Sequence, residues 1–403
     1  MSVLNGKKIL LGISGGIAAY KTASLVRLFI KAGAHVQVIM TPASKDFVTS
    51  LTLATLSKNP VYSTFYDKEN ENENWNNHVD LGLWADLMVI APATANTLSK
   101  MASGTCDNLL MAVYLSSKCP VYFAPAMDLD MYKHPTTIAN FLTLKQFGNT
   151  IIAAESGELA SGLSGEGRMA EPENIITFLE SDLESKLPLK GKKILITAGP
   201  TYEAIDPVRF IGNHSSGKMG FDIAISAANL GASVILVSGP TNCKVDNSLI
   251  QVINVVSAQD MYDACHLYYA DVDVAIAAAA VADYKPKNVA DQKIKKAADD
   301  FTIELEKTKD ILSSLGDLKK DQFLIGFALE TENEVENAKL KIQKKNLDLI
   351  VLNSLRDSGA GFGKTTNKVT FIDKFFNIEP MELKSKESVA DDILNKVIAF
   401  FYE

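Results

Sequence analysis

The stretch "NGKKILLGISGG" (residues 5–16) decides the fold, and "KGKKILITAGPT" (residues 190–201) repeats its pattern in the second half of the chain. Each stretch is a short apolar run that ends in a glycine-rich turn. A helix-compatible segment follows each turn, and then a second apolar run, "GAHVQVIM" (33–40) or "GASVILVS" (231–238). A strand, a glycine-rich turn, a helix and a second strand open a doubly wound parallel sheet. The sequence therefore predicts an α/β protein with two doubly wound domains.

The segment "ESDLESKLPLKGKK" (180–193) is the predicted boundary between the domains, which we place at 1–185 and 190–403. Its charges interrupt an amphipathic pattern, Pro188 ends any helix, and Gly191 precedes a new apolar run. A chain of 403 residues is also longer than one ordinary core. Further apolar runs predict buried strands in "DLMVIAP" (86–92), "PVYFAPA" (120–126), "VDVAIAAAA" (272–280), "QFLIGFA" (322–328) and "LDLIVLN" (347–353).

The composition excludes several classes of partner. A net charge of -8 gives no indication of nucleic acid or of an anionic membrane surface. The longest charge-free apolar run, "VAIAAAAVA" (274–282), is too short to span a bilayer. The four cysteines form no C-x-x-C pair, and the sequence shows no signal peptide, which together predict a reduced, cytoplasmic protein. We therefore expect small-molecule partners, with no nucleic acid and no membrane.

The first half carries three polar turns that follow predicted strands. "GISGGIAAYK" (12–21) lets the backbone approach a phosphate, with the Ser14 hydroxyl and the N-terminus of the next helix as donors. "APATANT" (91–97) and "APAMDLDMY" (124–132) follow two later strands, and open parallel sheets bind ligands beyond the carboxyl ends of their strands. We expect a ligand site at this edge. A turn without a ligand is the alternative for the first motif.

Residues 1–175 resemble the flavin-dependent cysteine decarboxylases, a family with a flavodoxin-like fold that binds FMN. The resemblance rests on the motifs "SGGIAAYK", "HVDL", "PATANT", "PAMDLDMY" and "GELASGLSGEGRMAEP". It implies that FMN oxidises the thiol of a cysteinyl substrate towards a thioaldehyde, which lets CO2 leave, and then returns the electrons. It also implies that FMN is bound by Ser14, Gly15, Gly16, Ile17, Thr41, Ser44, Thr94, Asn96 and Thr97.

The same resemblance implies that His78 is the acid/base, because its proton is mobile near neutral pH, and that Met127 and residue 128 hold the substrate. The chain departs from the family at two positions. The family pattern Pro-x-Met-Asn has Asp128 here, and Ser161 replaces a reactive cysteine. Our hypothesis is that a protonated Asp128 supplies the missing acid and that Ser161 relays the proton. The alternative is a first half that binds flavin or regulates without decarboxylation.

The stretch "GNHSSGKMG" (212–220) matches a phosphate-binding loop of the G-x-x-x-x-G-K-[ST] type except at Met219, where a hydroxyl would hold magnesium. Such a loop follows its strand directly, whereas a long loop intervenes here. The sequence instead predicts that backbone N–H groups, with Ser215, Ser216 and Lys218, bind an anion at a helix N-terminus. The Mg2+ ion would then arrive with the phosphates of the nucleotide, and we assign no metal ligands to the protein.

Residues 190–373 resemble the phosphopantothenate–cysteine ligases through "ITAGPTYEAIDPVRFIGNHSSGKMG", "AAAAVADYKPKN", "QKIKK", "IGFALET" and "KKNLDLIVLN". The two halves together resemble the bacterial bifunctional coenzyme A biosynthesis family, which implies a Rossmann-like, CTP-dependent ligase domain. In the implied reaction the carboxylate of 4'-phosphopantothenate attacks the α-phosphate of CTP, giving an acyl-cytidylate and pyrophosphate. The amine of cysteine then displaces CMP, and fixed cations and N–H donors should dominate catalysis of both steps.

The ligase resemblance implies that Lys293 is catalytic and that Asn213 handles the acyl-cytidylate. The implied substrate- and nucleotide-binding residues are Ser215, Ser216, Lys218, Ala277, Ala278, Ala279, Asp283, Lys293, Lys309, Asp310, Ile311, Leu312, Phe327, Lys341 and Lys345. A solvated charge is the alternative for Lys293, and a solvated helix face is the alternative for Lys341 and Lys345. The resemblance also implies a homo-oligomer, with dimers of the ligase half and trimers of the flavin half.

A nucleotide-dependent dehydrogenase is the competing class, because glycine-rich strand–turn–helix units are common. The first turn reads Gly12-x-x-Gly15-Gly16 rather than G-x-G-x-x-G, and no acidic residue ends the second strand at Met40. The sequence therefore favours the bifunctional enzyme.

Overall fold

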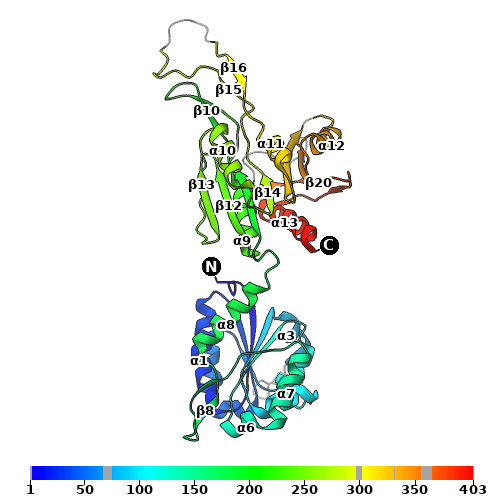
Figure 1. Cartoon of the computed structure of the whole chain (residues 1–403). Coiled ribbons are helices and arrows are strands. Elements are labelled where there is room, and N and C mark those ends of the chain that lie inside the picture. The colour runs from blue at the N-terminus through cyan, green and yellow to red at the C-terminus, as the bar shows by residue number, and fades with distance from the viewer. Residues whose placement is uncertain (1, 67–74, 296–301, 331, 355–364, 403) are drawn as a thin grey trace. The chain divides into compact units, whose positions relative to one another are not determined.

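A computed structural model of the chain describes residues 2–66, 75–295, 302–330, 332–354 and 365–402. The chain forms two compact units, residues 1–185 and 186–403 (Figure 1). Among the described residues, no helix has the length and apolar character needed to cross a membrane.

The N-terminal unit is built on a six-stranded parallel sheet in the order β3-β2-β1-β4-β5-β6. Its strands are β1 (Lys8–Ile13), β2 (His35–Met40), β3 (Val61–Tyr62), β4 (Leu87–Ala93), β5 (Val121–Pro125) and β6 (Thr150–Ile151). When the two-residue edge strand β3 is set aside, the other five strands follow the flavodoxin-like order. The predicted doubly wound sheet is confirmed.

Helices cover both faces of this sheet, which explains why every residue of β4 is buried. One core contains α1, α2 and α8, and the other contains α4, α5 and α7. Figure 1 shows α1 and α8 on one side of the sheet, and α3 and α7 on the other. The helices are α1 (Thr22–Lys31), α2 (Ser50–Ser57), α3 (His78–Trp84), α4 (Ala95–Ser103), α5 (Leu109–Ser116), α6 (Leu129–Lys133), α7 (Pro135–Gln146) and α8 (Pro172–Ser185), with 3-10 turns at Ile17–Lys21 and Pro42–Asp46. An antiparallel hairpin, β7 (Glu155–Glu158) and β8 (Ser164–Arg168), precedes α8.

The C-terminal unit is built on an eight-stranded sheet in the order β13-β12-β9-β14-β17-β18-β20-β21. The first six strands are parallel and follow the Rossmann order, while the last two are antiparallel. The strands are β9 (Lys193–Ala198), β12 (Ser233–Ser238), β13 (Ile250–Asn254), β14 (Val274–Ala277), β17 (Phe323–Glu330), β18 (Leu349–Ser354), β20 (Val369–Asp373) and β21 (Ile378–Pro380). The predicted Rossmann-like fold is confirmed.

The helices of this unit again cover both faces. One core contains α9 (Lys218–Asn229) and α13 (Lys386–Tyr402), and the other contains α10 (Ala258–Tyr269), α11 (Ile311–Leu318) and α12 (Glu334–Lys344). Three short antiparallel ladders complete the unit, formed by β10 (Tyr202–Ala204) with β11 (Phe210–Gly212), β15 (Tyr284–Pro286) with β16 (Leu305–Lys307), and β19 (Thr366–Asn367) with β22 (Lys384–Ser385).

The β10–β11 hairpin lies where the sequence indicated only a long loop before Gly212. Its turn is too irregular to be read from the sequence, but the rings of Tyr202 and Phe210 stack with centroids 3.9 Å apart across the ladder. Cross-strand aromatic pairs of this kind stabilise short hairpins.

Helix α9 approaches β9 closely at Gly220. A Cβ atom there would lie 2.6 Å from the Cβ atom of Ala198 and 3.0 Å from the carbonyl oxygen of Thr197. Because both neighbours are short or part of the backbone, neither can move aside cheaply. The position of α9, and therefore of its N-terminus, depends on this glycine.

We expect Gly220→Val to lower the free energy of unfolding of the C-terminal unit by about 1–3 kcal/mol, because overpacking forces α9 away from the sheet. Denaturant titration of the intact chain measures this change. Asn229→Val introduces the same side chain at the exposed last residue of α9, and should change stability by less than about 0.5 kcal/mol. Equal losses in the two variants would contradict the close-packing explanation.

Candidate active sites

The turns that follow β1, β2 and β4 form a first cavity of about 550 Å³ at the carboxyl edge of the N-terminal sheet. Five of the predicted FMN-binding residues line this cavity, namely Gly15, Thr41, Thr94, Asn96 and Thr97. Thr94 is the N-cap residue of α4, so that the helix N-terminus also faces this edge. The structure therefore brings together residues from three turns that are far apart in the sequence.

Two predicted FMN-binding residues support the turns and do not line the first cavity. The buried Ser14 hydroxyl donates to the carbonyl oxygen of Pro92 over 2.6 Å and accepts from the N–H of Thr94 over 3.0 Å. Ser44 likewise donates to the carbonyl oxygen of Thr41 over 2.7 Å. In this arrangement Ser14 has already used its one proton and can only accept from a ligand.

The residues of the first cavity fit a phosphorylated flavin. The buried Thr41 hydroxyl oxygen has no hydrogen-bond partner among the described residues, and buried hydroxyls rarely remain unpaired. A Cβ atom at Gly15 would lie 2.8 Å from the Cβ atom of Ala43, so only glycine lets the backbone pass here. A ligand oxygen at this turn would satisfy Thr41.

A second cavity of about 540 Å³ shares Ala126 and Met127 with the first. Its walls include Gly16, Ile17, Asp128, Ser161 and the β7–β8 hairpin. The hairpin is anchored by a hydrogen bond from the Met127 N–H to the carbonyl oxygen of Gly167 (3.0 Å). A Cβ atom at Gly167 would lie only 2.3 Å from the Met127 carbonyl oxygen, so this contact also needs glycine.

The two positions that depart from the family lie together in the second cavity. The Ser161 hydroxyl donates to Oδ1 of Asp128 over 3.1 Å, and the N–H of Leu129 donates to the same oxygen over 2.7 Å. Asp128 is the N-cap residue of α6. The structure therefore pairs these side chains directly, although they are separated by 33 residues in the sequence.

His78 is the first residue of α3, and its ring lies edge-on to the rings of Phe65 and Trp75. Helix α3 connects two parallel strands and therefore runs antiparallel to them. Its N-terminus consequently lies at the carboxyl edge of the sheet. The buried Nδ1 atom of His78 has no partner among the described residues. His78 is nevertheless not among the residues that line the first or the second cavity, so the structure does not bring it together with Asp128.

Sequence reasoning missed a charged group beside the second cavity. Lys21 is 7% exposed, and its ammonium group donates to the carbonyl oxygen of Met169 (3.0 Å) and to Glu171 (2.9 Å). Arg168 contacts the same carboxylate at 2.6 Å. The hydrogen bond from Lys21 holds the pKa of Glu171 below its usual range. The only sequence signal was the position of Lys21 at the end of the glycine-rich motif.

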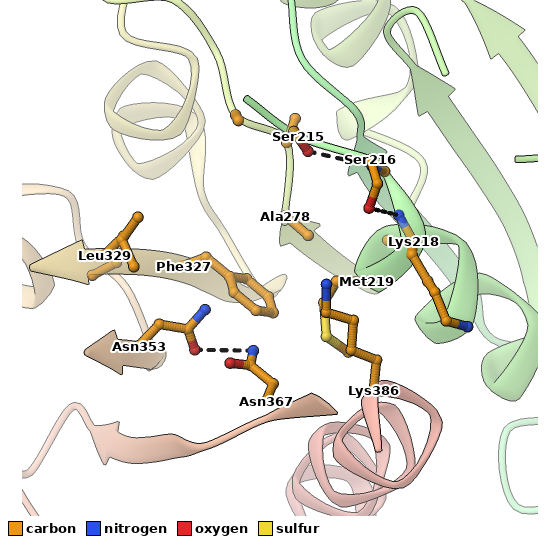
Figure 2. Close-up of a pocket in the computed structure, with 15 residues that line it drawn as sticks. Ser215, Ser216, Lys218, Met219, Ala278, Phe327, Leu329, Asn353, Asn367 and Lys386 are labelled. Carbon is orange, nitrogen blue, oxygen red and sulfur yellow. Dashed lines mark hydrogen bonds between the residues drawn. The ribbon is translucent and has the colours of Figure 1, made fainter. Parts of the chain in front are cut away.

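Two cavities lie at the carboxyl edge of the C-terminal sheet and share Ala279 and Phe327. The third cavity, of about 490 Å³, contains seven predicted nucleotide-binding residues besides these two: Ala277, Asp283, Lys309, Asp310, Ile311, Leu312 and Lys345. The fourth cavity, of about 180 Å³, contains Ser215, Ser216, Lys218 and Ala278 (Figure 2). The structure thus collects most of the predicted set around Phe327.

The loop before α9 presents N–H groups to the fourth cavity. Ser215 and Ser216 accept from the N–H groups of Gly217 and Lys218, and Gly217 has a left-handed backbone with φ of 76°. The N-cap residue Gly217 has no side chain with which to cap α9, and Ser216 accepts from the first N–H group of the helix instead. The Lys218 ammonium group pairs with Asp222 at 2.9 Å, which raises the pKa of Lys218. Lys218 is therefore partly neutralised within the protein.

Asn213 lies beside the turn that follows β14. Its amide nitrogen donates to the carbonyl oxygens of Val281 (2.9 Å) and Ala280 (3.4 Å). Because both neighbours are acceptors, the nitrogen must face them and the amide oxygen faces away. If Asn213 handles the acyl-cytidylate by donating from its amide to the substrate carbonyl, its side chain must first rotate.

The remaining predicted lysines are held by neighbours. Lys345 pairs with Asp310 at 2.9 Å, and the Lys309 ammonium group lies 4.6 Å from the centre of the Tyr262 ring. Burial acts to raise the pKa of Asp310, but the N–H of Ser313 and the ammonium group of Lys345 lower it overall. Lys341 pairs with Glu330 and does not line the third or the fourth cavity.

Lys293 is exposed and lines neither cavity, but its loop is tethered. The Asp206 carboxylate accepts from the N–H of Ile294 (3.1 Å) and from the Arg209 guanidinium, which donates to the Ile294 carbonyl oxygen (2.7 Å). Burial acts to raise the pKa of Asp206, but the N–H groups of Val208 and Ile294 and the Arg209 guanidinium outweigh it and hold that pKa well below its usual range. Asp206 and Arg209 are site-supporting residues that the sequence did not reveal.

Three polar side chains of the fourth cavity were not predicted. Asn353, at the end of β18, accepts from the Asn367 side chain over 3.2 Å, and Lys386 begins α13. Asn353 could have been predicted from the sequence, because a polar residue at the end of a buried apolar run lies where parallel sheets bind ligands. Asn367 and Lys386 lie in polar segments and carried none.

The fold and the cavities define a two-domain protein in which a flavoprotein unit is joined to a Rossmann-like ligand-binding unit. Residues 2–184 match the family described as Flavoprotein, and residues 189–401 match the DNA/pantothenate metabolism flavoprotein C-terminal domain. The chain belongs to the bifunctional coenzyme A biosynthesis family, which confirms the resemblance drawn from the motifs.

The chain is similar to several known proteins. The chain is 45% identical to the coenzyme A biosynthesis bifunctional protein CoaBC of Bacillus subtilis (strain 168) over 98% of both chains. It is 53% identical to a cysteine/cysteine sulfinic acid decarboxylase of an unknown prokaryotic organism, over 88% of this chain and 100% of that protein. A crystal structure of the C-terminal domain of CoaBC is 46% identical, with a TM-score of 0.46, over 54% of this chain and 99% of that one.

We expect Asp206→Asn to release the Lys293 loop, because an amide cannot accept from all the donors that surround this carboxylate. Hydrogen exchange at Ala290 and Ile294, whose N–H groups bond to Ile205 and Asp206, should become about tenfold faster or more. Asp246→Asn, at an exposed acid, is the control and should leave both amides unchanged.

The lowered pKa of Asp206 defines the pH range over which the tether should hold. A carboxyl whose pKa is depressed on folding stabilises the folded state above its ordinary pKa of about 3.9, and loses that contribution only as the pH falls through the lower folded value. The parent protein should therefore protect both amides throughout pH 5–8. Rapid exchange of the parent in this range would contradict the tether.

Proposed function

We propose that this protein catalyses two consecutive steps of coenzyme A biosynthesis. Its C-terminal unit joins cysteine to 4'-phosphopantothenate in a CTP-dependent reaction through an acyl-cytidylate, with Mg2+ carried by the CTP phosphates. Its N-terminal unit then decarboxylates the product to 4'-phosphopantetheine with FMN as cofactor. The observation that carries this proposal is the 45% identity to a bifunctional CoaBC protein along 98% of the chain, with both units intact. We further propose that the enzyme is a cytoplasmic homo-oligomer.

In the ligase reaction, negative charge develops on phosphoryl oxygens and then on a carbonyl oxygen. The partial positive charge at the N-terminus of α9 and the hydroxyl protons of Ser215 and Ser216 would stabilise the phosphates. Lys309 and the N-terminus of α11 face the larger third cavity, which we assign to the cytidine. Lys293, on its tethered loop, supplies the mobile cation for the reacting carboxylate and phosphate.

In the decarboxylation, the bound FMN would supply the electron acceptor and donor for the substrate thiol. Gly15, Thr41 and Thr94 would hold it in the first cavity, and the substrate would enter the second cavity, which shares Met127. Ser161 and Asp128 are in hydrogen-bond contact with Ser161 as the donor, so a proton path from Asp128 to Ser161 requires this bond to reverse once Asp128 is protonated. Asp128 would store the proton, and Ser161 would pass it to the product carbon as CO2 leaves.

One incubation tests both reactions. The purified protein is mixed with CTP, Mg2+, 4'-phosphopantothenate and cysteine, and the products are followed by mass spectrometry. Pyrophosphate should appear first, CMP and 4'-phosphopantothenoylcysteine should appear together, and 4'-phosphopantetheine should appear last. Ligated product without its decarboxylated form would favour the alternative in which the first half only binds flavin or regulates.

A second candidate activity is decarboxylation of free cysteine or cysteine sulfinic acid, which the name of the 53% identical relative suggests. The departures at Asp128 and Ser161 also allow a different substrate. Incubation with either amino acid, without CTP, separates the two activities. Release of CO2 under these conditions, and none from 4'-phosphopantothenoylcysteine, would favour this second candidate.

We expect Lys293→Gln to lower ligase turnover roughly 100-fold or more, because one positioned donor or cation is worth that much in the transition state. The fold should remain intact, since an exposed charge contributes little stability. Lys295→Gln, two residues along the same loop and also exposed, is the matched control. Equal turnover in the two variants would remove Lys293 from the mechanism.

We expect Asp128→Asn to lower CO2 release from 4'-phosphopantothenoylcysteine roughly 100-fold, because it removes the stored proton, and Asp128→Asn with Ser161→Cys to restore it. Asp130→Asn, at an exposed acid of the same helix, is the control. Full CO2 release by Asp128→Asn alone would contradict the proton path.

A further inference from the structure

Lys386, the first residue of α13, is a buried cation at the wall of the fourth cavity. Its side chain is 7% exposed, and Figure 2 shows it rising from α13 so that its ammonium group lies beside Met219. We propose that Lys386 is a catalytic residue of the ligase reaction, the fixed cation that receives the pyrophosphate leaving group. This assignment rests on the proposed CTP-dependent function.

The charge of Lys386 is not satisfied by the protein. Its ammonium group forms no ion pair and no hydrogen bond with any other described residue, although its backbone N–H donates to Thr365 (3.0 Å). The nearby carboxylate of Asp222 pairs with Lys218 instead. Burial lowers the pKa of Lys386. A buried, unpaired ammonium group is costly, and an anion in the cavity would relieve that cost.

Two structural elements define the backbone position of Lys386. The short β19–β22 ladder pairs Asn367 with Lys384, two residues before Lys386. Helix α13 then packs against α9 through Val389, Ala390 and Ile393 in the shared core. A cation held by two elements needs little reorganisation when charge develops near it, which is the condition for effective electrostatic catalysis.

The remaining walls of the fourth cavity also favour an anion. Among the described residues no acidic side chain lines it, and the N-terminus of α9 contributes its partial positive charge. A volume of about 180 Å³ suits a diphosphate group better than a whole nucleotide. Since Ala279 and Phe327 are shared with the third cavity, a nucleotide whose cytidine lies there would extend its terminal phosphates past Phe327 towards Lys386.

This placement defines a role in the first chemical step. A carboxylate oxygen of 4'-phosphopantothenate forms a bond to the α-phosphorus of CTP. The bond from that phosphorus to the bridging oxygen of the β-phosphate breaks, and its electron pair leaves with pyrophosphate. The leaving group therefore gains negative charge beside Lys386, whereas the acyl-cytidylate remains on the other side of Phe327.

The test compares Lys386→Met with Lys396→Met, a matched change on the surface of the same helix, where the lysine pairs with Glu379. Calorimetry measures binding of inorganic pyrophosphate, and pyrophosphate release from CTP measures the first step. Lys386→Met should weaken pyrophosphate binding and slow its release by about 10- to 100-fold, and Lys396→Met should change neither. The Tm of ligand-free Lys386→Met should equal or exceed that of the parent, because a buried unpaired charge is removed.

Other outcomes separate this inference from the proposed function. If Lys386→Met lowers the Tm and lowers every activity alike, its role is structural and the inference is wrong. If the parent ligates normally and Lys386→Met retains its affinity for pyrophosphate, the inference fails while the ligase remains. If the parent protein consumes no CTP, but Lys386→Met still weakens pyrophosphate binding, then the role of Lys386 in binding pyrophosphate is supported. In that case only the ligase assignment fails.

Discussion

All four cavities follow from one constraint, which is that the parallel strands of a doubly wound sheet end at the same edge. Helices cover both faces of each sheet, and strands such as β4 are buried along their whole length. Polar side chains can therefore gather only where strands end and turns begin. In the N-terminal unit these turns follow β1, β2, β4 and β5, and in the C-terminal unit the corresponding groups follow β9, β14 and β18. The position of each site is a consequence of how the apolar core is covered.

The buried charged side chains around these sites are of two kinds, those that are paired within the protein and those that are not. The Asp206 carboxylate is surrounded by N–H donors and the Arg209 guanidinium, so that it fixes the geometry of a turn and of the Lys293 loop. The Lys386 ammonium group has no such partner among the residues that the structure describes. A buried charge that is fully paired maintains structure, whereas one that is left unpaired is retained at the expense of stability and indicates where a ligand completes the site.

The sequence predicted the general architecture well, because glycine-rich turns and apolar runs report directly on strands and their ends. It also identified many of the residues around Phe327 and five of those that line the first cavity, since these lie in the turns themselves. It could not show that Ser14 is turned inwards to bond with Pro92, because that depends on how two distant turns meet. Lys386 and Asn367 were missed for a related reason, as antiparallel strands added after the parallel sheet return them to its edge. The departures at Asp128 and Ser161 were visible as single letters, but their hydrogen bond required the β7–β8 hairpin.

That hairpin has an anchor and a tip, and the two ends tolerate change very differently. At the anchor, Gly167 lies so close to Met127 that any side chain would collide with the backbone. At the tip, Ser161 is exposed and its side chain supports no core contact. A replacement at the tip therefore alters the chemistry offered to the second cavity without disturbing the fold. A single substitution at position 161 would therefore change the group offered to the second cavity, and the hairpin tip is a place where this chemistry can vary at little structural cost.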